Sequence, residues 1–170
     1  GDSSAFGSDS LTVAPYLGDD TLSPFVERCH RTQSGLFVLV KTSNPGSGFI
    51  QDLVVDQTSI AQRVAAWVNQ QSQSEIEKKL SAETFGETWS SFGAVVGATY
   101  PEQLKAFRDA MPNSWLLVPG YGAQGGSAAD VAGGFHQNGL GAIVNNSRGI
   151  IFAYRNSQYQ HHTNWQRAIE

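Results

Sequence analysis

The chain has 170 residues, a formal net charge of -4, 40% apolar and 15% charged residues. This balance is typical of a globular domain and not of a disordered segment, and the absence of basic clusters argues against a nucleic-acid partner. No apolar run reaches the roughly 20 residues of a membrane span. Because the single cysteine, Cys29, cannot form an internal disulfide, we expect one domain over residues 1–170 in a reducing compartment, the cytoplasm.

The first half of the chain predicts two strands and two helices. Short apolar runs at 11–13 and 36–40 are typical of strands, and the second is unbroken, as in a strand buried on both faces. A helical stripe follows Asp20, and a second stripe marks one face of a helix from 58 to 71. We expect the polar stretch 70–83 to be a helical extension or an excursion with little core.

The second half predicts three strands, at 92–97, 115–118 and 142–144. Thr99 and Glu102 form a capping-box pattern before a helix whose apolar face carries Leu104, Phe107 and Met111. A helix from Ser127 to about 135 separates the last two strands, and the tail 151–170 is expected to form a final helix.

Strands therefore alternate with helices about five times, which indicates a parallel sheet covered by helices. Two architectures fit: a piece of a (β/α) barrel, since a full barrel needs about 250 residues, or a small doubly wound sheet. No G-x-G-x-x-G opens the first helix, which argues against a Rossmann domain. In either architecture, binding sites form where polar and glycine-rich residues follow the strands.

The stretch 118–126, VPGYGAQGG, is expected to be a strand, a glycine loop and the start of a capped helix. Its glycines, among them Gly122, Gly125 and Gly126, allow sharp turns and a close backbone approach to a ligand. The N–H groups of the following helix would suit a phosphate or a carboxylate. The alternative is a strand-to-helix turn without a ligand.

A second anion site is expected directly after the last strand. Arg148 stands there beside Ser147, and a guanidinium can hold a phosphate through two parallel hydrogen bonds. Two consecutive strand ends with anion donors are similar to the phosphate site of (β/α) barrels after strands seven and eight. The alternative for Arg148 is a surface ion pair.

Other side chains near strand ends are candidates for binding or catalysis. The hydroxyl of Ser43 can read the edge of a base or an amide, and Gln124 can bridge a phosphate and a ring carbonyl. Lys41 is a candidate Schiff-base or phosphate lysine, although strand alternation can equally direct it away from the site. Taken by itself, Asp2 is expected to be an exposed carboxylate in a loop. No metal site is expected, and the histidines are expected at the surface: His30, His136, His161 and His162.

Four ordered motifs resemble the orotidine 5′-phosphate decarboxylase family, in particular its longer bacterial class. They are TSNPG at 42–46, VGAT at 96–99, PGYGAQGG at 119–126 and NSRG at 146–149. The resemblance runs from about 11 to 154. It implies a (β/α)8 TIM barrel of which this chain holds about the last five βα units.

The resemblance also implies the activity: cofactor-independent and metal-independent decarboxylation of orotidine 5′-phosphate to uridine 5′-phosphate, by a homodimer. Ser43 would hydrogen-bond the pyrimidine, Gln124 would link phosphate and base, and Pro119 would line the ring pocket. The phosphate would be held by the glycine-loop backbone and the last strand end: Gly122, Gly125, Gly126, Ser147 and Arg148.

One motif of the family is matched only in part. Its D-x-K-x-x-D motif ends in residues that correspond to Gly1 and Asp2, and that aspartate reaches into the neighbouring subunit's active site in the family. We therefore expect the catalytic lysine upstream of Gly1, in a truncated, cleaved or partial chain, and no turnover by the 170 residues alone. Two alternatives stay open: a catalytically silent phosphate- or nucleotide-binding piece, and another phosphate-binding barrel enzyme, such as an aldolase with Lys41 as its Schiff base or an epimerase.

Overall fold

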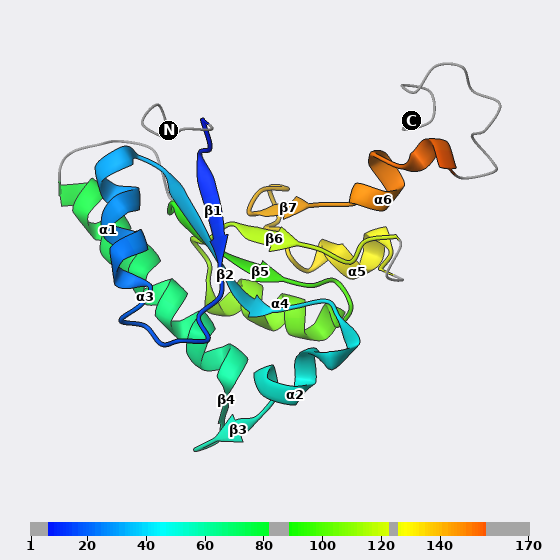
Figure 1. Cartoon of the computed structure of the whole chain (residues 1–170), viewed down its shortest axis with the longest axis horizontal. Coiled ribbons are helices and arrows are strands. Elements are labelled where there is room, and N and C mark those ends of the chain that lie inside the picture. Colours follow the sequence, from blue (N-terminus) through cyan, green and yellow to red (C-terminus); the bar gives the residue numbers. More distant parts are fainter. Residues whose placement is uncertain (1–6, 82–88, 123–125, 156–170) are drawn as a thin grey trace.

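The computed structural model describes residues 7–81, 89–122 and 126–155. Five parallel strands form one sheet in the order of the sequence, β1-β2-β5-β6-β7 (Figure 1). The strands are β1 (Ser10–Val13), β2 (Gly35–Lys41), β5 (Phe92–Val96), β6 (Leu116–Val118) and β7 (Ala142–Val144). A doubly wound sheet reverses its strand order at a switch point, and this sheet does not. The described sheet is therefore wound in one direction, as in a (β/α) barrel.

Helices connect the strands, as the apolar periodicity predicted. α1 (Ser23–Thr32), α3 (Ile60–Ser81), α4 (Pro101–Ala110) and α5 (Ala128–Ala132) link successive strands of the sheet, and α6 (Ser147–Ile150) follows β7 (Figure 1). The chain ends, within the described residues, in the short 3₁₀ helix η2 (Ala153–Arg155), where a final helix was expected; 156–170 lie outside the described residues. None of the described helices is long and apolar enough to cross a membrane.

The core lies between the sheet and the helices. In β2, Leu36, Val38 and Val40 alternate with half-buried residues, and they join a cluster that includes Val68 of α3 and Leu104 of α4. All residues of β5 are buried, as expected for a central strand covered on both sides. The predicted strands are thus confirmed to within one or two residues.

A compact excursion fills the segment between β2 and α3. It contains the 3₁₀ helix η1 (Pro45–Ser47), α2 (Gly48–Gln51) and a hairpin of β3 (Val54–Val55) and β4 (Thr58–Ser59). Asp56 and Gln57, the two hairpin turn residues, both have positive φ angles of 51° and 65°. Two such residues define the type I′ turn that matches the twist of a hairpin.

Two local expectations were wrong. Thr99 does not cap α4: the N-cap is Tyr100, no side chain caps it, and the Thr99 hydroxyl donates to the Ser43 carbonyl at 2.9 Å instead. The helical extension expected at 70–83 is present, since α3 runs to Ser81, but the expectation of little core there was wrong, because Ser72, Glu75 and Ile76 are all buried. The polar side chains of Ser72 and Glu75 are buried because they bind the backbone at the start of β5.

Buried polar residues hold the amino ends of the strands. Glu75 accepts hydrogen bonds from the Ser90 hydroxyl at 2.6 Å and from the Ser91 N–H at 2.8 Å. Arg108 donates to the carbonyls of Gly141 and Ser114, both at 2.8 Å. Burial lowers the pKa of Arg108 to about 10, which still leaves it charged at neutral pH. The entries to β5, β6 and β7 are therefore fixed by charge-assisted hydrogen bonds.

We expect Glu75→Gln to destabilise the complete protein that carries this chain by about 1–3 kcal/mol at pH 7. Burial acts to raise the pKa of Glu75, but hydrogen bonds from Ser90 and Ser91 outweigh it and the pKa is lowered. A lowered pKa stabilises the folded state above the ordinary value and this contribution is lost as the pH falls, so the difference between variant and wild type should shrink as the pH is lowered from neutral to below the ordinary pKa of a glutamate. Urea unfolding across this range measures it. Glu77→Gln, at an exposed position of the same helix, is the control, and a pH-independent difference would contradict the prediction.

Candidate functional site

The carboxyl ends of four neighbouring strands meet at one rim of the sheet. Backbone hydrogen bonds continue past the strands: the Gly97 N–H donates to the Lys41 carbonyl at 2.8 Å, and the Ala98 N–H to the Pro119 carbonyl at 2.8 Å. The Asn145 N–H donates to the Val118 carbonyl at 3.3 Å. The segments after β2, β5, β6 and β7 are therefore tied to one another directly.

Ser43 is fixed at this rim from the side of β5. Its carbonyl accepts the Thr99 hydroxyl at 2.9 Å, and its backbone lies against Gly97. A Cβ built on Gly97 would lie 2.8 Å from the Cα, the Cβ and the N of Ser43, closer than real Cβ contacts. Only glycine at position 97 allows this approach. No hydrogen bond within the described residues uses the Ser43 hydroxyl, so it is available to a ligand.

The glycine loop after β6 closes on itself. Gly120 and Gly122 have φ angles of 103° and 70°, which side chains rarely adopt. The Gly122 N–H donates to the Gly126 carbonyl at 2.8 Å, and the Gly126 N–H to the Gly120 carbonyl at 3.2 Å. The predicted site residues Gln124 and Gly125 lie outside the described residues.

A small cavity of about 120 Å³ opens between this loop and the end of β7. It brings together three residues that the sequence predicted, Pro119, Ser147 and Arg148; its other lining residues are Gly120, Tyr121, Asn145 and Asn146. Arg148 is exposed, and none of the described carboxylates forms an ion pair with it. The surface ion pair considered for Arg148 is thus not seen in the described part of the chain.

Asn146 supports this cavity and was given no role from the sequence. Its side-chain oxygen accepts the Gly149 N–H at 2.9 Å and so caps α6. A Cβ on Gly122 would lie 3.1 Å from its side-chain nitrogen, so the glycine loop packs directly on Asn146. The signal in the sequence was an asparagine directly before a helix start, where it is a preferred cap.

The start of α5 offers fewer donors than expected. Ser127 and Asp130 form a capping box in which the carboxylate accepts both the N–H and the hydroxyl of Ser127 at 2.7 Å. These hydrogen bonds, the hydroxyl first, hold the pKa of Asp130 below its usual range. Two N–H groups of this helix end are thus bonded within the capping box, and the anion donors that line the strand-end cavity include the Arg148 guanidinium and the Ser147 hydroxyl.

Several other candidate residues lie elsewhere. Asp2 lies outside the described residues. Lys41 is buried and its ammonium contacts both carboxylate oxygens of Asp52 at 2.7 Å, away from the residues that line the strand-end cavity. His136 bonds the Pro112 carbonyl and His30 packs edge-on against Phe92. No cluster of three potential metal ligands exists among the described residues.

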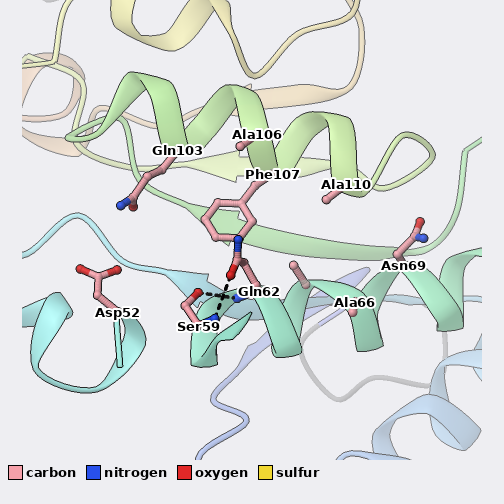
Figure 2. A pocket seen from close by; sticks show the side chains of 10 residues that line it. Asp52, Ser59, Gln62, Ala66, Asn69, Gln103, Ala106, Phe107 and Ala110 are labelled. Atoms are coloured by element: carbon pink, nitrogen blue, oxygen red, sulfur yellow. Dashed lines mark hydrogen bonds between the residues drawn. The ribbon is translucent and has the colours of Figure 1, made fainter. Parts of the chain in front are cut away.

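A larger cavity of about 490 Å³ lies between α3 and α4 (Figure 2). It is lined by small and amide side chains from both helices and by Phe107, with Asp52 and Ser59 at one end (Figure 2). No residue of the strand-end cavity lines it. The two cavities are therefore separate, and only the strand-end cavity contains residues predicted from the motifs.

Comparison with known proteins identifies close relatives. The chain matches the orotidine 5′-phosphate decarboxylase / HUMPS family over residues 3–159. Orotidine 5′-phosphate decarboxylase of Rhodopirellula baltica is 54% identical over 171 residues, which cover 99% of this chain and 54% of that protein. The enzyme of the same name from Caldicellulosiruptor bescii is 48% identical over 151 residues, 89% of this chain and 47% of that protein.

Solved structures agree with these relatives. The OMP decarboxylase of Leishmania donovani matches with a TM-score of 0.65 and 31% identity over 89% of this chain and 52% of that one. The UMP synthase of the same organism matches with a TM-score of 0.67 and 34% identity, over 89% of this chain and 30% of that one. The chain spans about half the length of the curated relatives it matches.

We expect Gly97→Ala to destabilise the complete protein by about 1–3 kcal/mol, because the added methyl group collides with the Ser43 backbone. Urea unfolding at pH 7 measures this. Gly46→Ala is the matched control on the Ser43 loop, since its nearest contact, at 3.5 Å, is ordinary; we expect it to change stability by less than about 0.5 kcal/mol. Equal effects of the two substitutions would contradict the close packing of Gly97 on Ser43.

Proposed function

The chain belongs to the orotidine 5′-phosphate decarboxylase / HUMPS family, and from this we propose that the complete protein converts orotidine 5′-phosphate to uridine 5′-phosphate and carbon dioxide in pyrimidine biosynthesis. The observation that carries the proposal is the shared rim of Ser43 and the cavity of Pro119, Ser147 and Arg148. Hydroxyl and guanidinium groups at one rim suit a ligand with a polar ring and a phosphate.

Phosphate is proposed to bind between the ends of β6 and β7. The Arg148 guanidinium is exposed beside the cavity and can donate two parallel hydrogen bonds to phosphate oxygens. Ser147 adds a hydroxyl, and the backbone of the glycine loop, with Gly122, Gly125 and Gly126, is proposed to lie against the phosphate. The positive φ of Gly122 fits a loop whose backbone turns toward a ligand.

The pyrimidine is proposed to lie toward β2. Ser43 stands two strands away from Pro119 in the sheet, about 10 Å at the usual strand spacing. An extended nucleotide with its phosphate at Arg148 can direct its ring toward Ser43, with Pro119 against the ring and Gln124 between ring and phosphate. This chain then supplies the contacts that hold and orient the substrate.

The chemical step needs groups beyond these contacts. Cleavage of the carbon–carbon bond releases carbon dioxide and leaves the electron pair on the ring carbon, which must then receive a proton. We propose that a lysine upstream of Gly1, beside carboxylates that include Asp2, stabilises this carbanion and donates the proton. No metal or organic cofactor takes part in the proposed reaction. Binding energy from the distant phosphate would serve to close the site and stabilise the transition state.

The proposed function also implies an architecture for the complete protein. Within the described residues, β1 and β7 each pair on one side only, and unpaired parallel edges are costly to leave open. We propose that residues 1–170 form the carboxyl-terminal part of a single (β/α)8 barrel domain, closed by three preceding strands. The protein would work in the cytoplasm as a homodimer, with Asp2 reaching the partner subunit's site.

Lys41 argues against the aldolase alternative. A Schiff-base lysine must reach the substrate with a free amine, whereas Lys41 is 1% exposed and paired with Asp52. The aldolase alternative therefore lacks a lysine nucleophile at the strand-end cavity, since Lys41 does not reach it.

We expect Arg148→Ala to lower kcat/KM of the complete protein for orotidine 5′-phosphate about 10- to 100-fold, through loss of charge-assisted bonds to the phosphate. The rate of decarboxylation is measured from the carbon dioxide that is released. Arg31→Ala, an exposed arginine at the end of α1, is the control and should keep wild-type kinetics. Absence of turnover in the wild type, or an unchanged kcat/KM for Arg148→Ala, would refute the proposal.

A further inference from the structure

The loop that carries Ser43 is closed at its base by two side-chain contacts. The Lys41 ammonium, at the end of β2, contacts both oxygens of Asp52 at 2.7 Å, at the end of α2. One residue further on, the Thr42 N–H donates to the Gln51 side-chain oxygen at 3.0 Å, and the Gln51 amide nitrogen donates back to the Thr42 hydroxyl at 3.0 Å. We call Lys41, Thr42, Gln51 and Asp52 the clasp.

The position of Lys41 depends on an irregularity in the sheet. Leu39 pairs with Val95, but Lys41 pairs with Val96, so β2 contains one extra residue at this point. Such a bulge redirects the side chain that follows it. Strict alternation would place Lys41 on the face of Leu39; instead its ammonium lies 5.0 Å from the ring centre of Tyr100, at the start of α4. The bulge thus directs Lys41 to Asp52.

The rest of the loop has little apolar packing of its own. Asn44, Pro45 and Gly46 are exposed, and Phe49 is 82% exposed. A loop without a buried apolar anchor takes its position from its polar contacts. On the other side of Ser43, those contacts are the Thr99 hydroxyl bond and the packing on Gly97.

We propose that Lys41, Gln51 and Asp52 are positioning residues: they do not touch the substrate but hold Ser43 where it meets the pyrimidine. This rests on the proposed function. A hydroxyl that is fixed before binding loses less conformational freedom when the ligand arrives, so the clasp strengthens base recognition and leaves phosphate recognition at β6 and β7 unchanged.

The surroundings of Asp52 allow its contact with Lys41 to be perturbed in two different ways. The carboxylate is 45% exposed and stands at the end of the α3–α4 cavity (Figure 2). A Cβ on Gly48 would lie 2.9 Å from one carboxylate oxygen. Gly48→Ala therefore forces the carboxylate to move without removing a charge, whereas Asp52→Asn removes the charge and keeps the shape.

The test uses the complete protein and two competitive inhibitors of decarboxylation, uridine 5′-phosphate and ribose 5-phosphate, which lacks the base. In Asp52→Asn, Gln51→Leu and Gly48→Ala we expect the inhibition constant of uridine 5′-phosphate to rise about 10-fold, and that of ribose 5-phosphate to stay within about 2-fold. Asp56→Asn is the matched control, since it breaks an exposed pair with Arg63 at 3.5 Å on the same excursion; both constants should stay at wild-type values.

The outcomes are distinguishable. A wild-type protein that neither decarboxylates orotidine 5′-phosphate nor binds uridine 5′-phosphate refutes the proposed function itself. An active wild type whose clasp variants change both inhibition constants equally, or neither, refutes only the positioning role. Thermal unfolding of each variant reports folding, and because Gly48→Ala keeps every charge, it remains informative where Asp52→Asn fails to fold.

Discussion

The backbone ladder that continues past the strand ends is the constraint on which the candidate site depends. The hydrogen bonds from Gly97 to Lys41, from Ala98 to Pro119 and from Asn145 to Val118 join residues far apart in the sequence. Backbone bonds of this kind depend on no particular side chain, so they hold four loops in register while the loops differ in length and composition. The spacing of the strands in the sheet therefore sets the spacing of the side chains at the rim.

Glycine is essential at two close backbone approaches along this rim. At 97 a side chain would collide with Ser43, and at 126 it would come within 2.9 Å of the Gly120 carbonyl. In each case the missing side chain is the feature that lets one backbone lie against another. The glycine-rich motifs of this chain therefore serve the internal packing of the rim as well as the approach of a ligand.

The sequence predicted the strands well and the irregular features poorly. Apolar runs such as 36–40 and 92–97 indicate strands because burial demands them, and they were found nearly where expected. Thr99 was misassigned because a capping-box pattern does not reveal that a carbonyl 56 residues away competes for the same hydroxyl. The burial of Glu75 within the stretch 70–83 was missed because its partners, Ser90 and Ser91, come from the segment just before β5. Short-range patterns cannot report such partners.

The bulge in β2 shows the same limit within the candidate site. From alternation alone, Lys41 could face the site or turn from it, and one inserted residue decides between these. Because it is paired with Asp52, Lys41 is not available as a reacting amine. Among the described residues of the rim, the Ser43 hydroxyl and the Arg148 guanidinium remain as groups that can bind a ligand. The proposed decarboxylase therefore has its proton donor on a strand outside the described sheet. Because β1 and β7 each have one unpaired edge there, such a strand has a position to occupy within reach of the same rim.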